Sequence, residues 1–453
     1  MNFKFANGLK PLCNEEYRHF IGGSGMEYFC SENEYFSILN VAKADYELLS
    51  ENKIENNHFA LLCSDKLVTL FYCGNDGILY VSESENKNVP SFEEEKCEGE
   101  FATTFFAFEN DHSLIDCGMC LLVQCKDSSF FVIDSGHYFQ FNDNDRIYAF
   151  MRERTPEGQK VKINGWLITH GHTDHISKLI DFLKFNMNDV EIDGFYHNLL
   201  SPDYPNENWS DEEKETAHNL LKAMNESGIP QYYLHSGERF YVKNLRFDVL
   251  CTHEDIYPDF IDDYNDSSVC LMLTAESTKI LIPGDSAVKS NEILMRRFDE
   301  FLKADIVQVA HHGHTGLSKE CYEKINAACA IFPITKIMFD AEYPKKEANR
   351  RLIEIADEYY ITSDGTLEIP LPYKTGNIKK LPDESFEDFA KIRRIWRYTY
   401  SDEYKAMLYE RFLENGGNLK NNVFPVIPNG FIEKKPPLDK NSKDYIEDTY
   451  IGE

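Results

Sequence analysis

A short cluster of metal-type side chains constrains this chain more than any other feature. It reads His170-Gly-His172-Thr-Asp174-His175 and directly follows the apolar run 166–168. Imidazole nitrogens suit zinc, iron or manganese, and the carboxylate adds a hard oxygen donor. In a tight loop, His170 and His172 would face one ion while Asp174 and His175 face another. The alternative is a polar loop of hydrogen-bonded histidines, which would gain little for the fold without an ion.

Two later segments also place polar side chains at the ends of apolar runs. Asp285 follows the run 280–282, and His311 and His312 follow the run 306–310. Strand ends face the site in open α/β folds, so Asp285 could bridge two cations. We favour His312 as a ligand and His311 as the acid or polar group, with the reverse as the alternative. The simpler interpretations are an Asp in a turn and a pair of histidines capping a helix.

The pattern along the chain predicts three regions. Residues 1–98 are β-rich, with a hairpin formed by 67–73 and 78–81 around Asn75-Asp76-Gly77. From about residue 101, apolar strands alternate with helical periods, including a helix capped by Ser210 and Glu213 and ended by Gly228. This α/β region is expected to span 99–375. Residues 376–453 are predicted to form a helical and polar extension, with helices near 384–398 and 402–415.

The order of these motifs resembles the metallo-β-lactamase superfamily over about residues 101–373. Within it, the chain is most similar to a subgroup that includes the hydrolase domain of the competence protein ComEC and bacterial phosphorylcholine esterases. Besides the histidine cluster, the resembling segments are Phe131-Val-Ile-Asp134-Ser-Gly136, Asp116-Cys-Gly118-Met-Cys120, Gly284-Asp285, 304–313 and 359–369. The resemblance implies a four-layer αββα sandwich with the site at one sheet edge. It also implies two divalent ions, preferably zinc with iron or manganese as alternatives, held by His170, His172, Asp174, His175, Asp285 and His312.

The chain departs from the wider family at two places. A further family histidine about twenty residues before the bridging aspartate is replaced by Asn265, which is expected to line the substrate site and is a weak zinc ligand. His253 is a second candidate for that role, although a solvent-facing loop histidine is the favoured interpretation. A late family histidine is missing near Tyr343. His137 and His314 are loop histidines that we do not expect to bind metal directly.

Charge, hydropathy and cysteine placement limit the classes of partner and the cellular compartment that we expect. The net charge of −30 argues against a grip on long duplex nucleic acid or anionic membranes. No apolar run approaches the length of a membrane span, and the first residues lack a signal-peptide pattern. Most of the 12 cysteines lie in apolar runs, which predicts reduced thiols and a cytoplasmic protein. A redox or zinc role for the pair Cys117 and Cys120 is the disfavoured alternative.

The expected activity is hydrolysis by a metal-activated water, because no GxSxG nucleophile motif is present. By resemblance, the substrate would be a phosphodiester or another small anionic ester. Asp174 and His311 are the predicted catalytic side chains, and Asn265 the predicted substrate contact. The alternative is a catalytically weak metal-binding or sensing module that docks a protein partner through the C-terminal helices. A flavodiiron-type redox enzyme is disfavoured because no flavin-binding domain is apparent.

Overall fold

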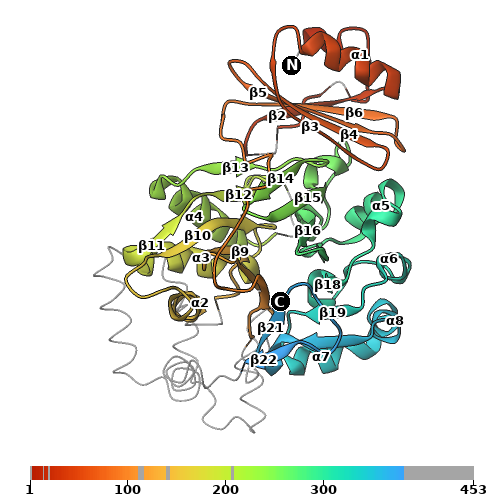
Figure 1. Cartoon of the computed structure of the whole chain (residues 1–453). Helices are drawn as coiled ribbons and strands as arrows, with labels where there is room; N and C mark the ends of the chain where they lie inside the picture. Colours follow the sequence, from red (N-terminus) through yellow and green to blue (C-terminus); the bar gives the residue numbers. More distant parts are fainter. Residues whose placement is uncertain are drawn as a thin grey trace.

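The computed structural model describes residues 3–13, 15–18, 21–110, 117–138, 143–205 and 209–381. They form three β-sheets with flanking helices (Figure 1). Two of the sheets face each other in the body of the molecule, and the third belongs to the N-terminal region. Within these ranges, every helix is too short or too polar to cross a bilayer.

The first sheet of the body has nine strands in the order β13-β12-β10-β9-β8-β7-β21-β22, with β11 beside β10. Strands β9 to β13 run parallel to their neighbours within that half, and the other half is antiparallel. The bounds are β7 (Thr104–Ala107), β8 (Cys120–Gln124), β9 (Phe130–Asp134), β10 (Val161–Ile168), β11 (Val190–Ile192), β12 (Phe195–His197), β13 (Gln231–Tyr233), β21 (Thr366–Pro370) and β22 (Lys379–Leu381).

The second sheet has seven strands in the order β14 to β20. The first four are antiparallel, and the last four are parallel to one another. The bounds are β14 (Arg239–Val242), β15 (Leu245–Cys251), β16 (Cys270–Ala275), β17 (Thr278–Ile282), β18 (Ile306–Gln308), β19 (Cys329–Phe332) and β20 (Glu358–Ile361).

Side-chain alternation along the strands produces four layers. In β9, Phe131 and Ile133 face the second sheet and pack in one core with Phe247, whose ring centroid lies 4.5 Å from that of Phe131. Phe130 and Val132 point the other way, into the core under the helices. The outer helices are α2 (Asp143–Glu153), α3 (Thr173–Phe185) and α4 (Asp211–Ser227) on the first sheet, and α5 (Val288–Arg297), α6 (Lys319–Ile325), α7 (Lys336–Glu342) and α8 (Glu347–Ile355) on the second. The predicted αββα sandwich is therefore confirmed.

The N-terminal region forms a six-stranded antiparallel sheet in the order β1-β2-β6-β5-β4-β3 (top of Figure 1). The predicted hairpin is confirmed, because Cys73 pairs with Ile78 across its turn. Helix α1 (Glu32–Ala42) covers one face and was not predicted, although Ser31 and Glu34 form a capping box there. The strands are β1 (Lys10–Pro11), β2 (Ser24–Phe29), β3 (Glu47–Ile54), β4 (Asn57–Cys63), β5 (Leu67–Cys73) and β6 (Ile78–Ser84).

The opposite face of this sheet packs against the body. The Phe71 ring packs directly on Gly237, where an added Cβ would lie only 2.4 Å from the ring. The Tyr80 hydroxyl donates to Glu254 Oε1 at 2.8 Å. Asp76, in the hairpin turn, pairs with Arg297 at 2.9 Å. Apolar contact, hydrogen bonds and an ion pair thus fasten the N-terminal sheet to the second sheet and α5.

Helix α4 follows its predicted signals closely. Ser210 accepts from the Glu213 backbone N–H as N-cap, and Gly228 ends the helix in the left-handed conformation with φ 67°. The helices expected near 384–398 and 402–415 lie outside the described residues. The proposed division of the chain after residues 98 and 375 stays a prediction.

Candidate metal centre

The predicted ligands come from four elements that end at one edge of the sandwich. His170 and His172 follow β10, while Asp174 and His175 lie in the first turn of α3. Asp285 follows β17, and His312 lies in the 3-10 helix Ala310–Gly313 after β18. β17 and β18 are parallel, so their carboxyl ends meet at the same edge. The two sheets thus bring together residues that are more than a hundred positions apart.

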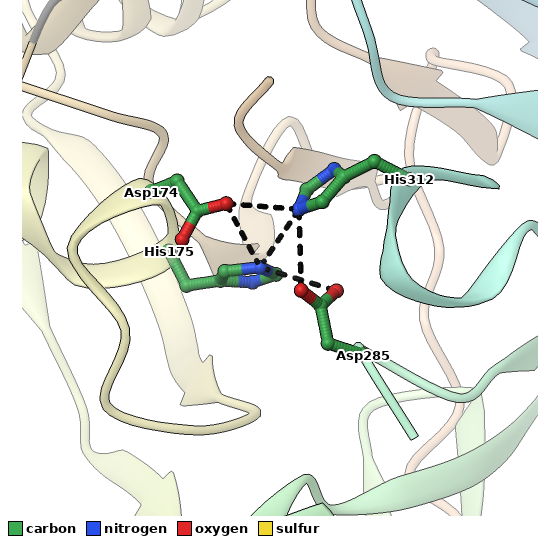
Figure 2. Close-up of side chains that lie close together, drawn as sticks. All are labelled: Asp174, His175, Asp285 and His312. Carbon is green, nitrogen blue, oxygen red and sulfur yellow. Dashed lines mark hydrogen bonds and ion pairs between the residues drawn. The ribbon is translucent and has the colours of Figure 1, made fainter. Parts of the chain in front are cut away.

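Four of these side chains converge on one point (Figure 2). The His175 and His312 Nε2 atoms are 3.1 Å apart. Asp285 lies 3.2 Å from His175 Nε2 through Oδ1 and 3.3 Å from His312 Nε2 through Oδ2. Asp174 Oδ2 is 3.0 Å from His312 Nε2. The candidate ligand atoms all lie within 4.8 Å of one another, which is the spacing of a metal-binding set.

The hydrogen-bond partners of the His175 and His312 Nδ1 atoms determine which nitrogen of each ring can bind a metal. His175 Nδ1 lies 2.6 Å from the Asp134 carboxylate, and His312 Nδ1 lies 2.8 Å from the Pro333 carbonyl oxygen. Both oxygens are acceptors, so each Nδ1 carries the hydrogen and each neutral ring presents an Nε2 lone pair. The two Nε2 atoms lie 3.1 Å apart, a distance at which they share either a proton or a bound cation. This arrangement fits a divalent metal held by imidazoles that outer partners orient.

A second set consists of His170, His172 and Asp285. His170 is fully buried, and its Nε2 has no hydrogen-bond partner among the described residues. That atom lies 3.9 Å from Asp285 Oδ2. A buried nitrogen without a partner is costly, and a bound cation would satisfy it. Asp285 belongs to both sets of candidate ligands.

The two sets differ in their electrostatics. Burial alone would lower the pKa of His312, but Asp285 and Asp174 outweigh it and raise that pKa to about 10. The pKa of His175 is also raised well above its ordinary value, because the neighbouring aspartates outweigh the effect of burial. Burial, together with the neighbouring His175, holds the pKa of His170 well below its ordinary value. The four-residue set therefore attracts positive charge strongly, while His170 stays neutral with a lone pair available.

Two contacts at this site were missed by sequence reasoning. Asp134 is fully buried with φ 55°, and it accepts from the Thr169 N–H at 2.8 Å as well as from His175. The sequence signal for Asp134 was its position at the end of an apolar run, but the segment 131–136 served only to identify the family resemblance. Cys117 donates its thiol to Asp174 Oδ2 at 3.4 Å. Cys120, by contrast, packs in the hydrophobic core.

His311 and Asn265 lie beside the donor sets rather than in them. His311 Nδ1 is 3.0 Å from the Thr315 carbonyl oxygen, and its Nε2 is 3.4 Å from Asn265 Nδ2. His311 and His312 both adopt positive φ, 49° and 54°, and their ring planes are inclined by 65° with centroids 6.4 Å apart. His312 belongs to the four-residue set and His311 to neither set, while the roles of ligand for His312 and acid for His311 stay predictions.

The remaining histidines lie elsewhere. His253 is fully buried and its Nδ1 is 2.5 Å from the Tyr17 hydroxyl, so the expected solvent-facing position was wrong. The chain uses it to join the N-terminal region to the body, and it belongs to neither donor set. His137 contacts the Thr173 hydroxyl at 3.4 Å. The His314 ring lies 5.5 Å from that of His311.

Comparison with known proteins agrees with this geometry. Residues 114–328 match the model of the Metallo-beta-lactamase superfamily. All six predicted ligands lie inside that match, which supports the superfamily for this part of the chain. No curated protein sequence matches the chain. The ComEC-like subgroup stays a prediction.

Three solved structures illustrate the wider similarity. Unliganded yeast PDE1 has 11% identity and a TM-score of 0.36, covering 58% of this chain and 98% of its own. The metallo-beta-lactamase fold protein YhfI from Bacillus subtilis has 10% identity and a TM-score of 0.34, with 57% and 95% covered. A metallo-beta-lactamase from Staphylococcus aureus has 15% identity and a TM-score of 0.28, with 64% and 72% covered.

Proposed function

We propose that the chain is a metal-dependent hydrolase that uses a metal-activated water to cleave a small anionic ester, a phosphodiester above all. The observation that carries the proposal is the pair of donor sets that share Asp285. Zinc is the preferred metal because each set offers two imidazole nitrogens, with iron and manganese as alternatives. Two such ions would supply a water of lowered pKa and polarise the ester oxygen under attack.

The chain's own residues would manage protons and orientation. Asp174 has a side chain that is 16% exposed, whereas those of His175, His312 and Asp285 are at most 1% exposed. Its carboxylate is therefore placed to take the proton that the water gives up. His311 lies outside the ligand sets, and a proton on its Nε2 would pass to the leaving oxygen. Asn265, 3.4 Å from that atom, would orient the substrate beside it.

Charge supports a small substrate rather than a polymer. The net charge of −30 repels long duplex nucleic acid, while two divalent ions would make the site itself locally positive. None of the 12 cysteines, all of which lie in the described ranges, forms a disulfide, and a reducing, cytoplasmic location is part of the proposal. A nucleotide or another small phosphodiester satisfies these conditions best.

Metal content per chain tests the proposal first. We expect close to two ions in the wild-type protein by elemental analysis, and fewer in the His170→Ala/His172→Ala variant. The fully loaded protein is then assayed on phosphodiesters, phosphomonoesters, lactones and β-lactams. Turnover of a phosphodiester that the double variant loses would support the proposal. A loaded protein that turns over none of these substrates would contradict it.

One observation favours the second candidate function, a catalytically weak metal-binding or sensing module. The set around His170 has three donors among the described residues, with Asn265 where the resemblance implies a histidine. A metal content of one ion per chain, with slow or absent turnover, would support this module instead.

A further inference from the structure

The three-donor set is bordered by a carboxylate that the metal-site motifs do not include. Glu213 Oε1 in α4 lies 3.9 Å from His172 Nε2. The His172 and Glu213 side chains are 17% and 28% exposed, so both are partly shielded from water. His172 also has an aromatic neighbour, because its ring centroid lies 5.0 Å from that of Tyr264. The histidine is thus held between an aromatic ring and a carboxylate.

The local packing shows why α4 comes so close. Gly171 separates His170 from His172, and a Cβ at this glycine would lie 2.9 Å from the Tyr264 hydroxyl and 3.6 Å from Ala217 Cβ. Ala217 lies four residues after Glu213, so both occupy the same face of α4. The missing side chain at Gly171 therefore lets this helix face rest on the histidine loop.

The two carboxylate oxygens of Glu213 have different neighbours. Oε2 accepts from the Ser210 backbone N–H at 2.9 Å and from the Ser210 hydroxyl at 2.7 Å, which completes the capping box. Oε1 is the oxygen that faces His172. The helix cap therefore holds the carboxylate in place while one oxygen remains directed at the imidazole.

We infer that Glu213 is a positioning residue for the ion held by His170 and His172. It accepts a hydrogen bond from His172 Nε2–H and so leaves Nδ1 of that ring as the ligand atom. Asp134 orients His175 in a similar way, but there the carboxylate accepts from Nδ1 and Nε2 is left as the ligand atom. The two atoms are 3.9 Å apart, which is longer than a hydrogen bond, so the inference requires the His172 ring to approach Oε1 while the cap holds the carboxylate. The inference rests on the proposed metal site.

Outer carboxylates of this kind fix the ring and strengthen its metal bond, and their loss typically costs about 10–100-fold in metal affinity. Glu213→Ala should therefore weaken one of two zinc ions by about this factor and leave the other unchanged. Glu213→Gln should weaken the same ion to a similar extent while keeping the helix cap, because its single carbonyl oxygen stays on the Ser210 donors and its NH₂ group, a donor, then faces His172.

The cap itself supplies the matched control. Ser210→Ala removes the hydroxyl contacts of the cap but keeps the backbone N–H that holds Glu213 Oε2, so it should lower the thermal unfolding midpoint without changing zinc affinity. All variants are made in the full chain and titrated with zinc against a chromogenic chelator, and the metal-free proteins are melted in parallel. In a His172→Ala background, Glu213→Ala should have no further effect on zinc binding.

The outcomes separate this inference from the proposed function. Wild-type zinc constants in Glu213→Ala would overturn the inference, and so would an equal loss of affinity in Ser210→Ala. An effect of Glu213→Ala that persists without His172 would show that the carboxylate acts by another route. A wild-type chain that binds no zinc would instead overturn the proposed function, and the inference with it.

Discussion

Asp134→Asn tests whether an outer carboxylate decides how His175 binds metal. In the wild type, Asp134 Oδ1 accepts from the Thr169 N–H at 2.8 Å, and Oδ2 accepts from the Thr169 hydroxyl and from His175 Nδ1, both at 2.6 Å. An asparagine of the same shape must keep its oxygen toward the Thr169 N–H. Its NH₂ group then faces His175 Nδ1 and donates to it. The neutral ring must carry its hydrogen on Nε2 instead.

The change would remove the lone pair that the site needs. His175 Nε2 lies 3.1 Å from His312 Nε2 and 3.2 Å from Asp285 Oδ1, at the centre of the four-residue set. Outer-partner substitutions cost about 10–100-fold in metal affinity. Because this one also imposes the wrong tautomer, we expect a loss near 100-fold, or about 2.7 kcal/mol. The number of buried hydrogen bonds is conserved, so unfolding should change by only about 1 kcal/mol.

The assay is competition for zinc with a chelator of known affinity, followed by elemental analysis of the dialysed protein. Asp248→Asn is the matched control, because Asp248 is equally buried but pairs with Arg239 and Arg246 in the second sheet. It should lose stability and keep both zinc constants. Wild-type zinc binding by Asp134→Asn, with a normal melting curve, would refute the tautomer argument.

Three further predictions concern the rest of the chain. Burial opposes ionisation of Asp76, but Arg296 and Arg297 lower its pKa to about 2, so Asp76→Asn should cost about 1–3 kcal/mol in urea unfolding at pH 7. That difference should vanish as the pH falls through 2, and a constant difference would contradict the assignment. Burial raises the pKa of Glu238 from 4.5 to about 7. Because the ionised form is the costly one, Glu238→Gln should stabilise the fold by up to about 3 kcal/mol at pH 8 and by less than about 1 kcal/mol at pH 5, measured by the same unfolding assay. If the C-terminal segment docks a partner, removal of residues 382–453 should leave thermal unfolding unchanged and abolish pull-down of that partner, whereas simple unfolding would show that the segment packs on the core, which is the interpretation we favour.

Local signals allowed much of the fold to be predicted. The cap at Ser210 and the stop at Gly228 are written within α4 and next to it, and the structure follows both. The hairpin turn likewise lies between the strands it joins. Helix α1 was missed even though its capping box has the same pattern, because it interrupts a region read as strands. Signals carried by neighbouring residues are reliable when no competing pattern surrounds them.

The candidate site could be predicted only in part. The cluster from His170 to His175 predicts a metal site without further information, since four metal-type side chains in one loop would gain little for the fold without an ion. The sequence also indicated Asp285 and the pair His311 and His312, first by the apolar runs before them and then by the resemblance. It did not assign a partner to each nitrogen, because a hydrogen bond such as that from His312 Nδ1 to the Pro333 carbonyl depends on how two loops meet.

The sequence by itself determined the alternation of strands and helices, the metal-type residues and the charge that disfavours long nucleic acids. Those properties depend on residue type and short spacing. Only the tertiary structure decided which ring of His311 and His312 enters the site, because the Pro333 carbonyl holds the His312 ring and the Thr315 carbonyl holds that of His311. It also placed His253 against Tyr17 and brought Glu213 to His172. These contacts join residues far apart in the chain, and they exist only once the sheets and helices have packed.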